Sequence, residues 1–171
     1  MAKLSLYVVA LFVAVVAQLA HAQSANEVSS TLTVNHVVAQ PDGKEVSEPA
    51  KTAKPGDILE YIVEYRNSGS GTAKKLEATL PIPLGTEYIP NSANPAGALA
   101  SVDGTTFEPA PLKRKVKQAD GTLVEQPVPL AEYRFIRWQP QDLPAGKSLK
   151  YSARAKMSTD APAPPSAPGK K

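Results

Sequence analysis

Strict alternation over residues 57–66 constrains the fold of this chain more than any other feature of its sequence. Every second position of this segment is apolar or aromatic, and these positions are occupied by Leu59, Tyr61, Val63 and Tyr65. Successive side chains of a β-strand point to opposite faces, so this set is predicted to face a core. Ile62 lies among glutamates on the other face, which indicates that this face is only partly exposed.

Turn signals divide the rest of the chain into similar short segments. Asp42, Asp103 and Asp120 each precede a glycine, and such Asp-Gly pairs favour tight turns because glycine tolerates positive φ. Further strands are predicted at residues 28–38, 45–46, 75–80, 87–89, 99–102, 131–138 and 147–157, with a hairpin of 113–117 against 122–124. About seven to nine short strands without helical periodicity predict an all-β chain, folded as an antiparallel β-sandwich.

The two ends of the chain are predicted to lie outside this domain. Residues 1–22 have the pattern of a secretory signal peptide, with Lys3, an apolar segment at 6–16 and the small-x-small site Ala20-His21-Ala22. Residues 23–27 are predicted to be a flexible N-terminus, 28–157 the β-sandwich domain, and 158–171 a disordered Pro/Ala-rich tail. The protein is therefore expected to be exported, to the periplasm, the cell surface or the medium, with no transmembrane segment after cleavage.

Composition narrows the classes of function. The formal net charge is +3, and removal of Lys3 with the signal peptide leaves 3 − 1 = +2, because residues 1–22 contain no acidic side chain. So small an excess does not suggest a nucleic-acid partner. The chain has no cysteine, which excludes disulfides, thiol catalysis and Cys-ligated zinc.

Several turn motifs resemble those of the bacterial conserved repeat domain, a family of domains of unknown function. They are Pro55-Gly56-Asp57, Tyr65-Arg66-Asn67 with the small-residue loop that follows, and the run from Pro83 through Gly85-Thr86 to Tyr88. Asn91-Ser92-Ala93 and residues 142–146 are similar to that family as well, so the resemblance covers residues 28–157. It implies an immunoglobulin-like module of bacterial surface or cell-wall proteins. The present chain has one copy, and its hairpin at 113–124 looks like an insertion.

No catalytic residue, cofactor or metal site is predicted. His36 is the only histidine after the signal peptide, and no nucleophile motif accompanies it, which is typical of a partly exposed strand histidine. The three Asp-Gly pairs lack the repeated acidic spacing of calcium loops and are explained as turns.

The basic run Lys113, Arg114, Lys115 and Lys117 is the candidate interaction surface. It could bind anionic polysaccharide or lipid headgroups, but lysines on an exposed strand also oppose edge-to-edge aggregation. Trp138 beside Arg137 could stack on a sugar, whereas a core tryptophan is the more frequent arrangement in a sandwich.

These observations predict a secreted structural or protein-interaction module of the cell envelope, not an enzyme. Its expected partners are other envelope or surface proteins, or further copies of itself, bound by strand addition at an open edge. A free N-terminal strand at residues 28–38 would be a candidate donor. The first alternative is a carbohydrate- or envelope-binding module using Trp138 and the basic hairpin, and the second is a hydrolase with an unrecognised site.

Overall fold

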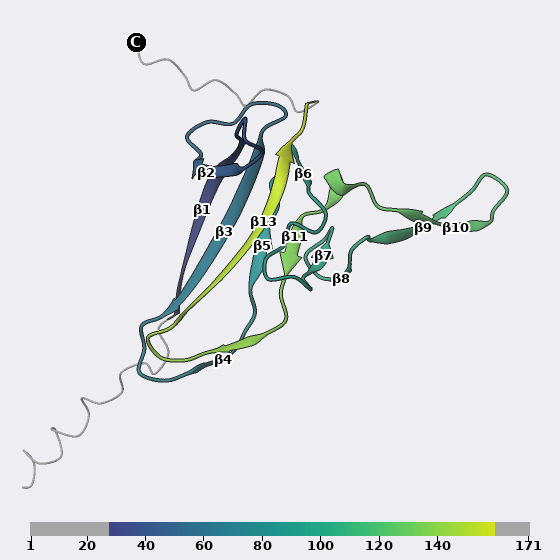
Figure 1. Cartoon of the computed structure of the whole chain (residues 1–171). Helices are drawn as coiled ribbons and strands as arrows, with labels where there is room; N and C mark the ends of the chain where they lie inside the picture. Colours follow the sequence, from purple (N-terminus) through teal and green to yellow (C-terminus); the bar gives the residue numbers. More distant parts are fainter. Residues whose placement is uncertain (1–27, 160–171) are drawn as a thin grey trace, which may run out of the picture.

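A computed structural model describes residues 28–159 of the chain (Figure 1). The predicted signal peptide, the flexible segment 23–27 and residues 160–171 of the predicted tail lie outside the described residues. In the described part, no helix is both long and apolar enough to cross a membrane.

The chain is all-β, and every strand pairing is antiparallel. The largest sheet has the order β2-β1-β3-β13-β6, formed by Glu45–Pro49, Val28–Ala39, Ile58–Asn67, Ser148–Met157 and Thr86–Tyr88. A second sheet has the order β5-β11-β7-β8, formed by Thr79–Pro81, Phe135–Arg137, Leu99–Ser101 and Glu108–Pro109. Two further pairs are β12 (Gln141–Leu143) with β4 (Ala73–Leu76), and β10 (Leu123–Pro127) with β9 (Lys113–Lys117).

The predicted count of seven to nine strands was wrong, because the described residues form 13. The single strand expected at residues 75–80 is divided between β4, which pairs with β12, and β5, which pairs with β11. Lys75 adopts a φ of 53°, outside the β region, and its N–H donates to Asp142 Oδ1 at 3.0 Å. This local bend redirects the chain from one pair of strands to the next.

The strand expected at residues 131–138 is also shorter than predicted. Its first part belongs to a 3₁₀ turn, η1 (Leu130–Glu132), which follows Pro129, and only Phe135–Arg137 is strand. The Tyr133 N–H donates to Leu130 O at 3.2 Å and closes the turn. Alternating aromatic residues favour a strand, but here Pro129 precedes a turn that buries Tyr133 completely.

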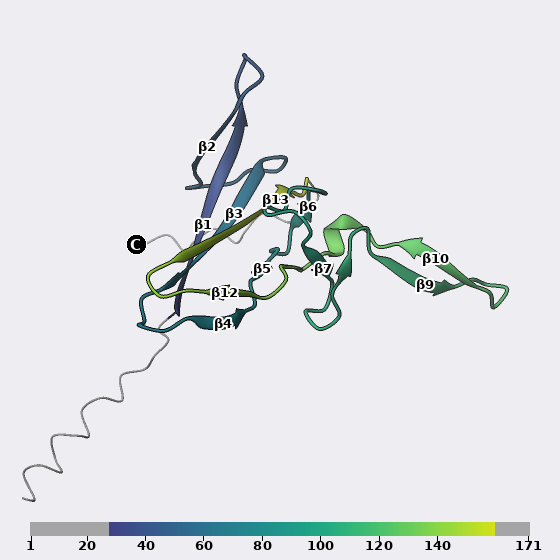
Figure 2. The ribbon, with the colours of Figure 1, turned by 60° about the horizontal axis from the view of Figure 1, so that its bottom comes forward.

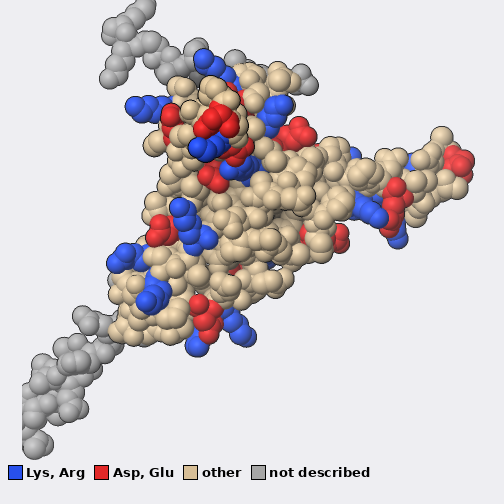
Figure 3. Space-filling model, viewed as in Figure 1, with Lys and Arg blue, Asp and Glu red and all other residues tan. Residues whose placement is uncertain are grey.

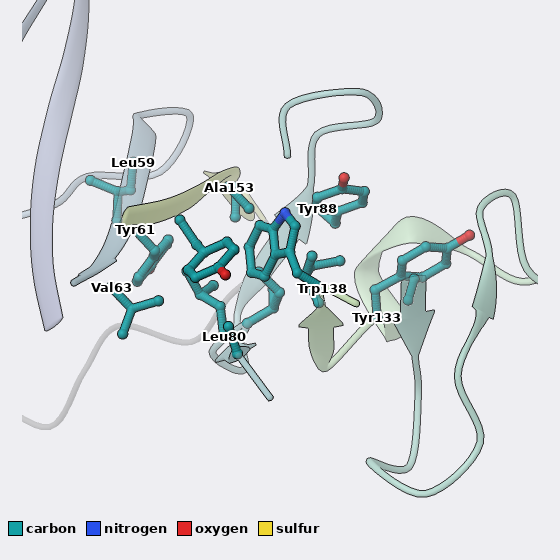
Figure 4. Packing of buried hydrophobic residues seen from close by; sticks show 14 of the residues in the cluster. Leu59, Tyr61, Val63, Leu80, Tyr88, Tyr133, Trp138 and Ala153 are labelled. Atoms are coloured by element: carbon teal, nitrogen blue, oxygen red, sulfur yellow. The ribbon is translucent and has the colours of Figure 1, made fainter. Parts of the chain in front are cut away.

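The predicted core face of the strand at residues 57–66 is confirmed in β3. Leu59, Tyr61 and Val63 of β3 are buried, whereas Tyr65 is half-buried and packs against their cluster. Across the ladder, Ala153 lies opposite Tyr61 and is also buried. The second sheet covers this face with Leu80, which Figure 4 labels, and with Ala100 and Ile136, and all three are no more than 1 % exposed.

Asn67 fixes the end of this core where β3 finishes. Its side chain is fully buried, and Nδ2 donates to Gly71 O at 2.7 Å and to Leu143 O at 2.9 Å. Its Oδ1 accepts the Gly69 N–H at 3.0 Å. One amide therefore shapes the loop after β3 and joins it to the end of β12.

Candidate interaction arm

Strands β9 and β10, with the turn between them, form a two-stranded arm over residues 113–127 that projects from the two larger sheets (Figures 1 and 2). The turn is built locally, as the Asp-Gly pair predicts. Gly121 has a φ of 88°, and Asp120 Oδ1 accepts from the Thr122 N–H at 3.0 Å and from Thr122 Oγ1 at 2.6 Å. These bonds from the Thr122 side chain and backbone lower the pKa of the Asp120 carboxyl below its usual range.

The register of the arm separates its side chains into two faces. Lys115 pairs with Glu125, and Val116 pairs with Val124. Directly paired residues share a face of the ladder, so the lysine face consists of Lys113, Lys115, Lys117, Leu123, Glu125 and Pro127. The opposite face, here called the valine face, consists of Arg114, Val116, Val124 and Gln126.

The structure therefore divides the predicted basic run between two faces. Arg114 forms a bidentate ion pair with Glu132 of η1, at 2.6 and 3.1 Å, which ties the start of β9 to the body. Lys113 Nζ lies 3.6 Å from Glu125 Oε2 within the arm. Four basic side chains against Asp120 and Glu125 give the arm a net charge of 4 − 2 = +2, with both signs visible in Figure 3. The arm is thus a mixed-charge surface and not a uniform basic patch.

The base of the arm is anchored in the core. Leu112 and Val128, the residues that flank the two strands, are buried and belong to the central apolar cluster. The Val128 N–H donates to Leu112 O at 2.9 Å, and the Leu112 N–H donates to the Tyr133 hydroxyl at 2.7 Å. A rigid anchor of this kind fixes the direction in which the arm projects.

The arm itself is exposed on both strands and at both edges. Every residue of β10 is exposed, and Leu123 and Val124 expose 66 % and 40 % of their surface. Among the described residues, β10 is the only strand beside β9, so each strand has an edge that no other strand covers. Open edges with apolar side chains are the usual substrate for strand addition.

A small cavity of about 180 Å³ lies where the arm meets the body. Its apolar wall is formed by Val102, Leu112 and Val128, and Arg114 and Glu132 line its rim. Pockets for small molecules usually measure about 300–1,000 Å³, so this space suits one apolar side chain better than a metabolite.

The surroundings of His36 do not favour the alternative of a hydrolase site. His36 is half-buried on β1, as expected, with Nε2 3.3 Å from Asp57 Oδ1. The nearby Ser47 pairs with Val37, which places it on the other face of the sheet, where its Oγ donates to Glu60. Within residues 28–159, no three His, Asp or Glu side chains are grouped to hold a metal ion.

Trp138 is a core residue, which confirms the more frequent of its two interpretations. Its side chain is only 4 % exposed, and its indole Nε1 donates to Pro95 O at 2.7 Å. Its ring centroid lies 4.9 Å from that of Tyr151. The indole face is therefore occupied by protein and does not form an exposed platform for a sugar.

The expectation of a free N-terminal strand was wrong. Residues Val28 to Val37 of β1 all pair with β3 in the same chain, because their β-branched alternation continues that sheet. On its other side, β1 pairs with β2 only from Asn35 onward. The first half of β1 is thus an open edge that could accept a strand, whereas donating β1 would require its removal from the sheet.

Comparisons with known proteins yield no relative for this chain. No family model, no curated protein and no solved structure matches it. The resemblance to the conserved repeat domain therefore stays a prediction.

Proposed function

We propose that this protein is an exported, non-catalytic structural or protein-interaction module of the bacterial cell envelope, and that its arm is the contact element. The observation that carries the proposal is the combination of a rigidly anchored base with two open edges. Leu112 and Tyr133 hold the base, whereas the strands beyond it are exposed. Because the strands of the arm are exposed and only its base packs in the core, the arm contributes little to the core beyond that base.

The proposed architecture is an immunoglobulin-like β-sandwich, in which the two larger sheets would form the two layers. In support, both sheets contribute to one apolar cluster, with Tyr61 and Ala153 from one and Leu80 and Ile136 from the other. Antiparallel sheets that bury one face each are typical of this architecture.

A carbohydrate- or envelope-binding module is the second candidate, and the lysine face of the arm is the observation that favours it. Lys115 and Lys117 are exposed on one surface, where they could meet an anionic polysaccharide or lipid headgroups. Trp138 would not contact the ligand of such a module, because its side chain is buried. Polysaccharide binding that depends on the lysines and is weakened by salt would favour it.

The proposal is tested by photo-crosslinking in the producing cell. A photoreactive amino acid is placed at Leu123 on the arm, and, as a matched control, at Leu84, which is 80 % exposed on the body. We expect a defined protein adduct from position 123 and no comparable adduct from position 84. Equal labelling at both positions, or labelling only at position 84, would contradict the proposal that the arm is the contact element.

A further inference from the structure

The hydrogen bonds at the two ends of the arm reveal which backbone groups face outward. Near the tip, the Gln118 N–H donates to Thr122 O at 2.8 Å, and at the base the Val128 N–H donates to Leu112 O at 2.9 Å. In an antiparallel ladder, alternate residue pairs exchange hydrogen bonds, so the even-numbered pairs bond within the arm. The intervening residues direct their backbone groups to the open edges, namely Lys113, Lys115 and Lys117 on β9 and Leu123, Glu125 and Pro127 on β10.

Charge opposes pairing of the β9 edges of two copies. An antiparallel β9–β9 contact centred on Lys115 would place that lysine opposite its own copy, and Lys113 opposite Lys117. Like charges directly opposite each other destabilise a strand pair. The lysines therefore protect this edge against a symmetric contact, as edge lysines commonly do.

Pairing of the two β10 edges is unfavourable for similar reasons. A contact centred on Glu125 would place two carboxylates opposite each other. It would also place Pro127 opposite Leu123 twice, so two N–H groups would be missing from the ladder, whereas a contact of β9 with β10 in the register of the arm places Pro127 only once, opposite Lys113. Neither edge is thus suited to pair with the same edge of a second molecule.

The two edges are complementary to each other. When β9 of one copy meets β10 of another in the register of the arm, Lys115 lies opposite Glu125 and Lys117 lies opposite Leu123. The same register places Val116 beside Val124, which extends the valine face into an apolar row across the contact. Each pairing that the arm already makes internally is repeated between the copies.

We propose that the partner of the arm is the arm of a second copy, joined by addition of β9 to β10 between copies. This inference rests on the proposed function and specifies its partner. Because the two edges lie on opposite sides of the arm, each copy keeps one free edge after pairing, and the pair as a whole keeps one β9 edge and one β10 edge. Such a head-to-tail contact leads to an open chain of molecules or a closed ring, not to a symmetric dimer.

Two proline substitutions separate the edges experimentally. Lys115→Pro blocks the β9 edge and Glu125→Pro blocks the β10 edge, and in each case the lost N–H points outward, so the internal ladder keeps its bonds. Lys115→Thr and Glu125→Thr, which retain the N–H, serve as matched controls. The molar mass of residues 23–171 is measured by analytical ultracentrifugation up to millimolar concentration.

The wild-type chain is expected to grow in mass with concentration, and each proline variant alone is expected to stay monomeric. An equimolar mixture of the two should reach the mass of a dimer and no more, because it contains one usable β9 edge and one usable β10 edge. A dimer of Glu125→Pro alone, or of Lys115→Pro alone, would show a symmetric contact and overturn the inference. A monomeric wild-type chain would overturn it as well, while crosslinking of a different protein at Leu123 would leave the proposed function standing.

Discussion

The hydroxyl of Tyr133 accepts a hydrogen bond from the backbone N–H of Leu112 at a distance of 2.7 Å. Tyr133 is completely buried and stacks on Tyr88, with ring centroids 5.7 Å apart. Leu112 is the residue immediately before β9, so this bond joins the base of the arm to an aromatic pair in the core. The direction of the arm is thus set from inside the body.

Tyr133→Phe should remove the hydrogen bond at the base of the arm without creating a cavity in the core. The ring remains, but the buried Leu112 N–H loses its acceptor, which typically costs about 1–3 kcal/mol. Urea unfolding should show this loss, and hydrogen exchange at the Leu112 amide should become faster. Tyr65→Phe, at a half-buried ring, is the control and should lose less stability. Unchanged exchange at Leu112 would show that the hydroxyl does not hold the arm.

Asn67→Ala should be among the most damaging single changes in the chain. It removes two hydrogen bonds donated to Gly71 O and Leu143 O and one accepted from the Gly69 N–H, all at a fully buried position. Several buried groups left without partners should lower the free energy of unfolding by at least about 2 kcal/mol. Denaturant titration measures this, and a loss below 1 kcal/mol, about one ordinary hydrogen bond, would contradict the role assigned to Asn67.

Trp138, the single tryptophan of the chain, should report on folding and not on ligands. Its indole is buried and bonded to Pro95 O, so its emission should be blue-shifted in the native state and shift to the red on unfolding. Trp138→Ala should destabilise the protein by about 3–5 kcal/mol, as is usual for a large core side chain. Titration with anionic polysaccharides should leave the native emission unchanged. Strong quenching by a sugar would contradict the core assignment.

Asp103 should make stability depend on pH at the acidic end. The backbone N–H groups of Thr106 and Thr105 donate to its carboxylate at 2.9 and 2.8 Å and hold its pKa below the usual range. A lowered folded-state pKa means that the contribution is complete above the ordinary carboxyl pKa of about 4 and is lost as the pH falls toward the folded-state value.

The difference in unfolding free energy between wild type and Asp103→Asn measures this effect. It should be constant near neutral pH and should narrow as the pH falls below about 4, because protonated aspartic acid resembles asparagine. A difference that grows on acidification would show that the sign is wrong.

The parts of the fold that follow a simple period could be predicted from the sequence. Alternation identified the buried face of β3, because a strand with one face in the core needs an apolar side chain at every second position. The Asp120-Gly121 pair identified the arm as an exposed hairpin, since this turn closes with local bonds alone. In both cases the determining contacts lie within a few residues.

What could not be predicted depends on partners far apart in the sequence. The bend at Lys75 is held by Asp142, and Arg114 is neutralised by Glu132 at the base of the arm. The basic run therefore looked uniform in sequence, although one of its members is fixed against η1. Strand pairing also depends on residues far apart in the sequence. Whether residues 28–38 are free or paired depends on β3, not on their own composition.

The claim that the arm is the contact element is tested most directly by trimming it in the producing cell. Residues 113–127 are replaced by a two-residue Asn-Gly turn, which joins the hydrogen-bonded pair of Leu112 and Val128 and leaves both residues in the core. The control shortens a different hairpin turn, at residues 40–44 between β1 and β2. The native mass of the protein in envelope extracts is then compared among these variants. We predict that trimming the arm reduces this mass to that of the monomer, with unchanged Trp138 emission, and that the control keeps the wild-type mass. A trimmed-arm variant that keeps the wild-type mass would place the contact elsewhere and contradict the account.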